Sequence, residues 1–193
     1  MAAGLVLAHG AGSNRNAPLL VAVDRALSTS GWLVERIDLA FRASRPHGPP
    51  GPGDAKRDQE SIRAAIGSMA ARAAPVFAGG HSYGGRQTTM LAAEDEMLLK
   101  ALLILSYPLH PPRRPLQLRT AHLKELRTPT LFIHGSRDPF GSMDEMRAAI
   151  ELIPVKTRLI ELEGAGHDLT SRRGADLAGI AGRIAREFID FAG

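Results

Sequence analysis

The stretch "PVFAGGHSYGGRQ", residues 75–87, decides how this chain is expected to fold. A short apolar run leads into two glycines, and Ser82 lies between these and two further glycines. This order predicts a β-strand that ends in a tight turn, with a helix beginning directly after it. Within the turn, Gly80, Ser82 and Gly84 match the pattern G-x-S-x-G, which is typical of an exposed, nucleophilic serine.

Apolar runs of strand length alternate along the chain with stretches of helical periodicity. The runs predict six strands, at residues 4–9, 32–39, 75–80, 101–107, 129–135 and 157–164. Apolar residues recur at helical spacing in at least three other stretches, 57–73, 143–153 and 177–188. Such alternation is typical of β-α-β units. We therefore expect a single α/β domain over residues 1–193, with a doubly wound, mainly parallel six-stranded sheet and helices on both faces.

Two segments interrupt the alternation. Residues 46–53, "PHGPPGPG", are too rich in proline and glycine for a helix or a central strand, so they predict an irregular loop after the second strand. Residues 107–115, "YPLHPPRRP", follow the fourth strand. Because the alternation resumes after each of them, neither is interpreted as a domain boundary.

The composition excludes several classes of protein. With 193 residues, 44% of them hydrophobic, the chain can form one substantial core but not two ordinary domains. It has no cysteine, which excludes disulfides and thiolate metal sites. The net charge of +4 comes from arginines that are scattered along the chain. Aromatic residues make up only 5% of the sequence, so a nucleic-acid partner is not expected. The first apolar run is far shorter than the roughly 20 residues that span a bilayer. We expect a cytoplasmic protein without a membrane partner.

Informative residues follow four of the predicted strands, at the edge where open parallel sheets bind ligands. Ser82 follows the third strand, Asp138 the fifth and His167 the sixth. A serine hydroxyl is a weak nucleophile unless a base removes its proton, and an imidazole held by a carboxylate can do so. The chain order Ser, Asp, His is that of a serine hydrolase built on such a sheet. We predict Ser82 as nucleophile, His167 as base and Asp138 as the acid that orients it.

The turn after the first strand, "HGAG", supplies a candidate for the second half of an oxyanion hole. The backbone amide of Tyr83, at the start of the predicted helix, is one expected donor. The amide of Ala11 is the preferred second donor, with Gly10 and Gly12 as neighbours that would also contact substrate. Neither glycine-rich turn fits a nucleotide site. A Walker loop needs a lysine after its last glycine, but Arg86 follows Gly85. In the turn after the first strand, Arg15 stands where a dinucleotide-binding motif has its third glycine.

The remaining histidines have simpler interpretations. His81 is expected to point away from the site, and His134 to support the acid's loop. His110 follows the fourth strand, with Arg113 and Arg114 after it. This segment has two possible interpretations. It forms a rigid proline-rich rim, or His110 and an arginine contact an acyl or anionic group of the substrate. Spacing typical of metal ligands is absent from the sequence, so we predict no metal and no cofactor.

One further acid follows the presumed base directly. Asp168 is expected to cap the last helix, which is predicted to begin near Leu169 or Thr170.

Over essentially its whole length, the chain resembles the α/β-hydrolase superfamily and is most similar to its small, lidless, dienelactone-hydrolase-like group. The strings that carry the resemblance are "HGAGSNRN", "GGHSYGGRQ", "YPLHPP", "HGSRDPFG" and "GAGHDL". They look like the KANL/Tex-like branch, whose animal members include a testis-expressed protein and a subunit of a chromatin acetyltransferase complex. The resemblance implies the same roles for Ser82, Asp138 and His167, and a sheet that begins at the family's third strand.

The chain also departs from this family. The segment between Ser106 and Pro129 is too short for a cap domain of the usual size, which implies a shallow pocket. Dienelactone hydrolase proper uses a cysteine nucleophile, so its activity is not expected here. The predicted reaction is hydrolysis of a small to medium carboxylic ester or thioester through an acyl-Ser82 intermediate. The alternative is a non-catalytic binding or scaffold protein on the same fold, since some animal members of the branch serve in complexes. No oligomeric state is predicted.

Overall fold

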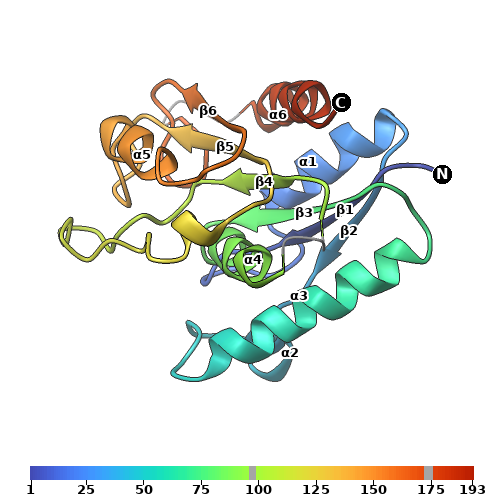
Figure 1. The fold of residues 1–193 in the computed structure, drawn as a ribbon, viewed down its shortest axis with the longest axis horizontal. Coiled ribbons are helices and arrows are strands. Elements are labelled where there is room, and N and C mark those ends of the chain that lie inside the picture. The colour runs from blue at the N-terminus through green and yellow to red at the C-terminus, as the bar shows by residue number, and fades with distance from the viewer. Residues whose placement is uncertain (96–98, 172–175) are drawn as a thin grey trace.

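A sheet of six parallel strands forms the centre of the computed structural model, which describes residues 1–95, 99–171 and 176–193. The strand order is β2-β1-β3-β4-β5-β6 (Figure 1). The strands are Gly4–Ala8 (β1), Leu33–Ile37 (β2), Val76–His81 (β3), Leu102–Leu105 (β4), Thr130–Gly135 (β5) and Thr157–Leu162 (β6). All six predicted strands are therefore confirmed, and the sheet is wholly rather than mainly parallel.

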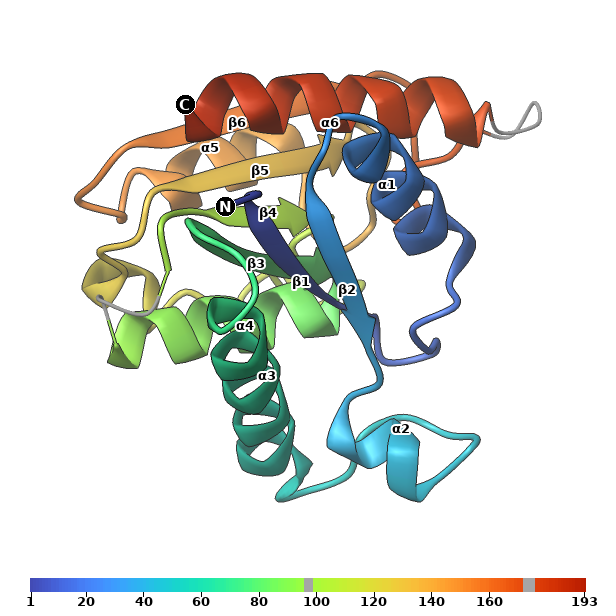
Figure 2. The ribbon, with the colours of Figure 1, turned by 90° about the vertical axis from the view of Figure 1, so that its right-hand side faces the viewer.

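Helices cover both faces of this sheet (Figure 2). They are Pro18–Thr29 (α1), Ala40–Ser44 (α2), Asp54–Ala70 (α3), Tyr83–Glu94 (α4), Met143–Ile150 (α5) and Leu177–Ala192 (α6), with a 3₁₀ turn at Leu123–Glu125. Helices α1 and α6 pack together on one face, while α3, α4 and α5 lie on the other. This arrangement confirms the predicted fold class.

Burial on both sides explains why the central strands read as continuous apolar runs. In β1, Leu5 and Leu7 point toward the core under α1 and α6, whereas Val6 and Ala8 point toward the core under α3 and α4. All four side chains are fully buried. The alternation follows from the two-residue period of a strand, and it places the end of β1 deep inside the molecule.

The order of the strands determines where a site can form. From β1 the chain moves to β2 at one edge of the sheet, and β3 then returns to pair with the opposite side of β1. The loops that follow β1 and β3 consequently begin side by side and lead to opposite faces. Open α/β sheets bind ligands at such a reversal, outside the carboxyl ends of the strands.

Two features of the helices differ from expectation. The last helix begins at Leu177 rather than near Leu169 or Thr170, and the carboxylate that caps it belongs to Asp176, which accepts a hydrogen bond from the Gly179 amide at 2.8 Å. Asp168 instead closes a local turn by accepting from the Thr170 amide at 3.0 Å. Both acids are good caps, so residue type alone did not distinguish them.

The second difference is α2, a short helix that the sequence analysis did not predict. It precedes the proline-rich loop 46–53, which is irregular as expected. Between β4 and β5 the chain forms a loop and the 3₁₀ turn, without an inserted cap domain. Within the three described ranges, no helix combines the length and hydrophobicity needed to cross a bilayer.

Candidate active site

Ser82 occupies a strained turn between β3 and α4. Its φ of 51° and ψ of −117° lie outside the regions that non-glycine residues ordinarily adopt. Glycine is required around it because the backbones of three elements meet there. A Cβ on Gly80 would lie 2.3 Å from the Ala8 carbonyl oxygen, and one on Gly84 would lie 2.5 Å from that of His9. The predicted tight turn is therefore present, and it is formed against the end of β1.

The structure brings together the three side chains that the sequence analysis selected. His167 Nε2 lies 2.7 Å from Ser82 Oγ, and His167 Nδ1 lies 2.7 Å from Asp138 Oδ2. Since the carboxylate accepts, Nδ1 carries the proton and Nε2 is free to accept from the serine hydroxyl. The Asp138 side chain is fully buried, whereas that of His167 remains about one-fifth exposed. Substrate can therefore reach His167 and Ser82, which both line the pocket, but not the buried carboxylate.

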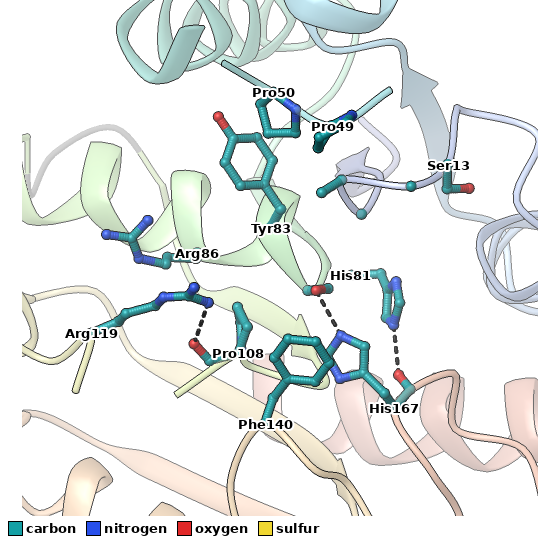
Figure 3. A pocket seen from close by; sticks show the side chains of 14 residues that line it. Ser13, Pro49, Pro50, His81, Tyr83, Arg86, Pro108, Arg119, Phe140 and His167 are labelled. Atoms are coloured by element: carbon teal, nitrogen blue, oxygen red, sulfur yellow. Dashed lines mark hydrogen bonds between the residues drawn. The ribbon is translucent and has the colours of Figure 1, made fainter. Parts of the chain in front are cut away.

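Two neighbours hold this arrangement. The Phe140 ring stacks on His167 with 4.1 Å between ring centroids (Figure 3). The Phe140 amide also donates to the second oxygen of Asp138 at 2.9 Å. His134, as expected, supports the loop of the acid, because its Nε2 donates to the Gly141 carbonyl at 2.8 Å. Burial lowers the pKa of His134, which favours the neutral ring in that position.

His81 differs from expectation, because it lines the pocket instead of pointing away from it. Its Nε2 donates to the backbone carbonyl of His167 at 2.7 Å (Figure 3). Burial lowers the pKa of His81 to about 4, so the ring is neutral near pH 7. His81 therefore holds the loop that carries His167 and does not contact the serine hydroxyl as a second base.

The two expected oxyanion donors lie in the same pocket. Tyr83, Ala11, Gly10 and Gly12 all line it, together with Ser82. Among the described residues, no carbonyl or side chain accepts a hydrogen bond from the Tyr83 or Ala11 amide. Both N–H groups are therefore available to a ligand, as an oxyanion hole requires.

Arg42, at α2, is a supporting residue that the sequence analysis missed. Its buried guanidinium donates to the carbonyls of Ala11 and Ser13 in the loop after β1. It also donates to three carbonyls in the segment that begins the proline-rich loop, those of Arg45, Pro46 and Gly48. Arg42 thus fixes the loop that carries the Ala11 amide. Its position depends on a short helix that has no clear pattern in the sequence.

The pocket has a volume of about 520 Å³ and opens beside Ser82. Its lining residues are Gly10, Ala11, Gly12, Ser13, Pro49, Pro50, His81, Ser82, Tyr83, Arg86, Pro108, Arg119, Phe140 and His167. Both segments that interrupt the sequence pattern contribute to it, the first through Pro49 and Pro50 and the second through Pro108. Arg86 and Arg119 are lining residues that the sequence analysis did not select.

His110 is not among the lining residues. Its ring is buried, with Nε2 3.5 Å from a carboxylate oxygen of Glu145 in α5 and Nδ1 2.9 Å from the Pro111 carbonyl. Arg113 and Arg114, which follow it, are exposed. The segment after β4 therefore contributes an arginine to the pocket, but it is Arg119 and not one beside His110.

The comparison with family models gives a match over nearly the whole chain. Residues 1–192 match a family described as "Alpha/beta hydrolase domain".

Solved structures with the same fold include a dienelactone hydrolase from Anabaena variabilis, at 24% identity and a TM-score of 0.74, which covers 98% of this chain and 87% of that one. Est1E from Butyrivibrio proteoclasticus, solved with ferulic acid, has 18% identity and a TM-score of 0.73 over 97% of this chain and 88% of its own. An alpha-beta serine hydrolase homologue from Coxiella burnetii has 13% identity and a TM-score of 0.71, covering 96% and 84%.

Proposed function

Because the chain belongs to the alpha/beta hydrolase family, we propose that it is a serine hydrolase acting on a small to medium carboxylic ester or thioester. The observation that carries this proposal is the continuous chain of contacts from Asp138 through His167 to Ser82, with 2.7 Å at both steps. A base within hydrogen-bond distance of the nucleophile, itself oriented by a buried acid, is the arrangement that acyl transfer requires.

The first half of the reaction acylates the enzyme. Ser82 Oγ attacks the carbonyl carbon while His167 Nε2 takes the hydroxyl proton, and negative charge develops on the carbonyl oxygen. The amides of Tyr83 and Ala11 donate to that oxygen. The bond to the leaving alkoxide or thiolate then breaks, and His167 returns the proton to it. Asp138 remains ionised and stabilises the imidazolium that forms in between.

The second half releases the acid. Water gives a proton to His167 Nε2 and attacks the acyl carbon, and the bond to Ser82 Oγ breaks as the serine recovers its proton. His167 lines the pocket and is partly exposed, so water can approach its ring, while stacking on Phe140 restricts the ring's rotation. No residue besides the relay and the two amides is needed for these steps.

Labelling with a fluorophosphonate probe tests the assignment of the nucleophile. Wild type is expected to be labelled, and Ser82→Ala to be unlabelled, with mass spectrometry locating the adduct on Ser82 rather than on Ser13, which lines the same pocket. Labelling that survives in Ser82→Ala would refute the nucleophile. Absence of labelling in wild type would favour the alternative, a non-catalytic binding or scaffold protein.

We also propose that the chain belongs to a narrower group, the KANL/Tex-like branch. The strings "YPLHPP" and "RDPFG" support membership of the KANL/Tex-like branch within the family. In the structure, these strings form the loop that carries Pro108 and the loop that carries Asp138 and Phe140, so both border the pocket. We also propose that the protein is located in the cytoplasm.

A further inference from the structure

Two arginines share one side of the pocket with the proposed nucleophile. Arg86 lies one helical turn after Ser82 in α4, and its amide donates to the Ser82 carbonyl at 2.9 Å. Arg86 and Ser82 both line the pocket. Arg119 comes from the loop after β4, and Figure 3 shows its side chain beside Pro108, on the same side as Arg86. Two fixed positive charges therefore border the space in which an ester would bind.

The position of Arg119 is determined by several contacts. The Tyr107 hydroxyl donates to the Arg119 carbonyl at 2.6 Å, and the Arg119 amide donates to the Leu109 carbonyl at 2.8 Å. Its guanidinium donates to the Pro108 carbonyl at 3.2 Å through one nitrogen, Nη1. The backbone is thus held in place while most of the guanidinium's donors remain available.

Neither arginine has an anionic partner among the residues that the structure describes. In the described parts of the chain, the ion pairs of arginine involve other residues than Arg86 and Arg119. The described residues that line the pocket include no Asp or Glu. Asp58, on the neighbouring helix α3, is already occupied, because its carboxylate accepts from the Phe41 amide at 2.9 Å and from the Tyr83 hydroxyl at 2.7 Å.

This arrangement is costly without a ligand. The Nε of Arg86 is buried and has no hydrogen-bond partner, which is uncommon for a charged donor. Burial and the charge of Arg86 both lower the pKa of Arg119. Burial, with a further contribution from the charge of Arg86, lowers the pKa of His122 to about 4. A bound anion would offset the repulsion between the two guanidinium groups and accept from the Arg119 donors that the Pro108 carbonyl leaves free.

We propose that Arg86 and Arg119 form a subsite for an anionic group, a carboxylate or a phosphate, that the substrate carries in addition to its scissile ester. This inference rests on the proposed hydrolase function and narrows its substrate class. Guanidinium groups suit both anions because their planar donors can bind two oxygens at once. Ala11, Pro49 and Pro50, which also line the pocket, offer apolar side chains to the rest of the molecule.

A matched pair of esters tests the subsite by kinetics. The 4-nitrophenyl hemiester of glutarate carries a carboxylate, whereas 4-nitrophenyl valerate has a neutral chain of similar length. We expect wild type to prefer the hemiester in kcat/KM, and Arg86→Gln and Arg119→Gln each to reduce that preference about 10- to 100-fold, as the loss of a charge-assisted hydrogen bond would. Arg119→Lys, which keeps the charge, should retain part of it.

Arg114→Gln is the control, since it removes the same charge from an exposed position in the same loop. It should leave the ratio of the two esters unchanged. If wild type cleaves both esters equally and neither arginine variant changes the ratio, the subsite is refuted while the hydrolase function stands. A loss of preference in Arg114→Gln of the same size would also refute it, because long-range charge would then explain the effect.

Binding to Ser82→Ala separates the subsite from catalysis and distinguishes the two anions. Titration calorimetry with glutarate and with inorganic phosphate should give heat for at least one of them, and the heat should be lost in the Ser82→Ala/Arg86→Gln double variant. Tighter binding of glutarate indicates a carboxylate, and tighter binding of phosphate indicates a phosphorylated substrate. If neither anion binds, or both bind the double variant equally, the subsite is refuted even for a protein that cleaves neither ester.

Discussion

Asp138 has no exposed side-chain surface, and each of its carboxylate oxygens accepts a hydrogen bond. One bond fixes the loop through the Phe140 amide, and the other selects the tautomer of His167. Because these two tasks use different oxygens, a change of chemistry at the second oxygen need not disturb the first. The acid therefore lends itself to a substitution that keeps the shape of the site and changes only the proton on the imidazole.

In Asp138→Asn, the amide can donate to Nδ1, so that Nε2 carries the proton and no longer accepts from Ser82. We expect kcat for a neutral ester to fall about 10⁴-fold, with a small change in KM. Asp168→Asn is the matched control, because Asp168 is a neighbouring acid whose carboxylate accepts from the Thr170 amide and not from His167. The assignment would be wrong if Asp138→Asn kept a tenth of the wild-type kcat while melting at the wild-type temperature.

At the scale of the element, the turn between β3 and α4 is a packing problem as much as a catalytic one. The Gly84 backbone amide donates to the His9 carbonyl at 3.1 Å, so α4 begins against the end of β1. There is no room for a side chain at this contact, and the obstacles are backbone atoms that cannot rotate away. The nucleophile's turn and the loop of the proposed oxyanion hole are consequently coupled through one glycine.

We expect Gly84→Ala to lower the free energy of unfolding by about 2 kcal/mol or more, because the new Cβ overlaps the carbonyls of Ala8 and His9. Gly67→Ala is the control, since Gly67 lies within α3 and a Cβ added there would have no atom within 4 Å. It should raise the free energy of unfolding by roughly 0.5–1 kcal/mol through helix propensity. Urea unfolding of both variants measures the difference, and equal stability of Gly84→Ala and wild type would contradict the packing argument.

The strands and the candidate site differ in how far the sequence predicts them. The sequence predicts the six strands because each is an apolar run in the alternating pattern, and it points to Ser82, Asp138 and His167, which the structure brings together, because each follows such a strand at the same edge of the sheet. Arg119 could not be found in this way. Its place depends on contacts with Tyr107 and Leu109 inside an irregular loop, which leave no periodic pattern.

At the scale of the whole molecule, buried histidines are distributed over the carboxyl edge of the sheet and its surroundings. Burial lowers the pKa of four of the seven histidines in the chain, His9, His81, His122 and His134. Each makes a hydrogen bond that fixes a loop or a helix as a neutral ring. Protonation of these rings is therefore resisted by the fold and not by the unfolded chain.

The consequence is a loss of stability in mild acid. Between pH 6.5, the ordinary pKa of histidine, and about 4, the pKa of His81 in the fold, the unfolded chain binds a proton at this position that the folded chain does not. The free energy of unfolding thus falls as pH falls through this window, by about 1.5 kcal/mol from His81 alone between pH 6.5 and 5. Well above pH 6.5 both states are neutral there and the dependence ends.

Urea unfolding at several pH values between 5 and 7 measures this slope above the range in which most carboxylates titrate. The slope should become shallower in His81→Gln, whatever the variant's absolute stability, because glutamine cannot take up the proton in either state. His47→Gln replaces an exposed histidine of the proline-rich loop and should leave the slope unchanged. A wild-type slope that persists in His81→Gln would mean that other groups carry the acid sensitivity, and that the contact between His81 and the His167 carbonyl tolerates a charged ring.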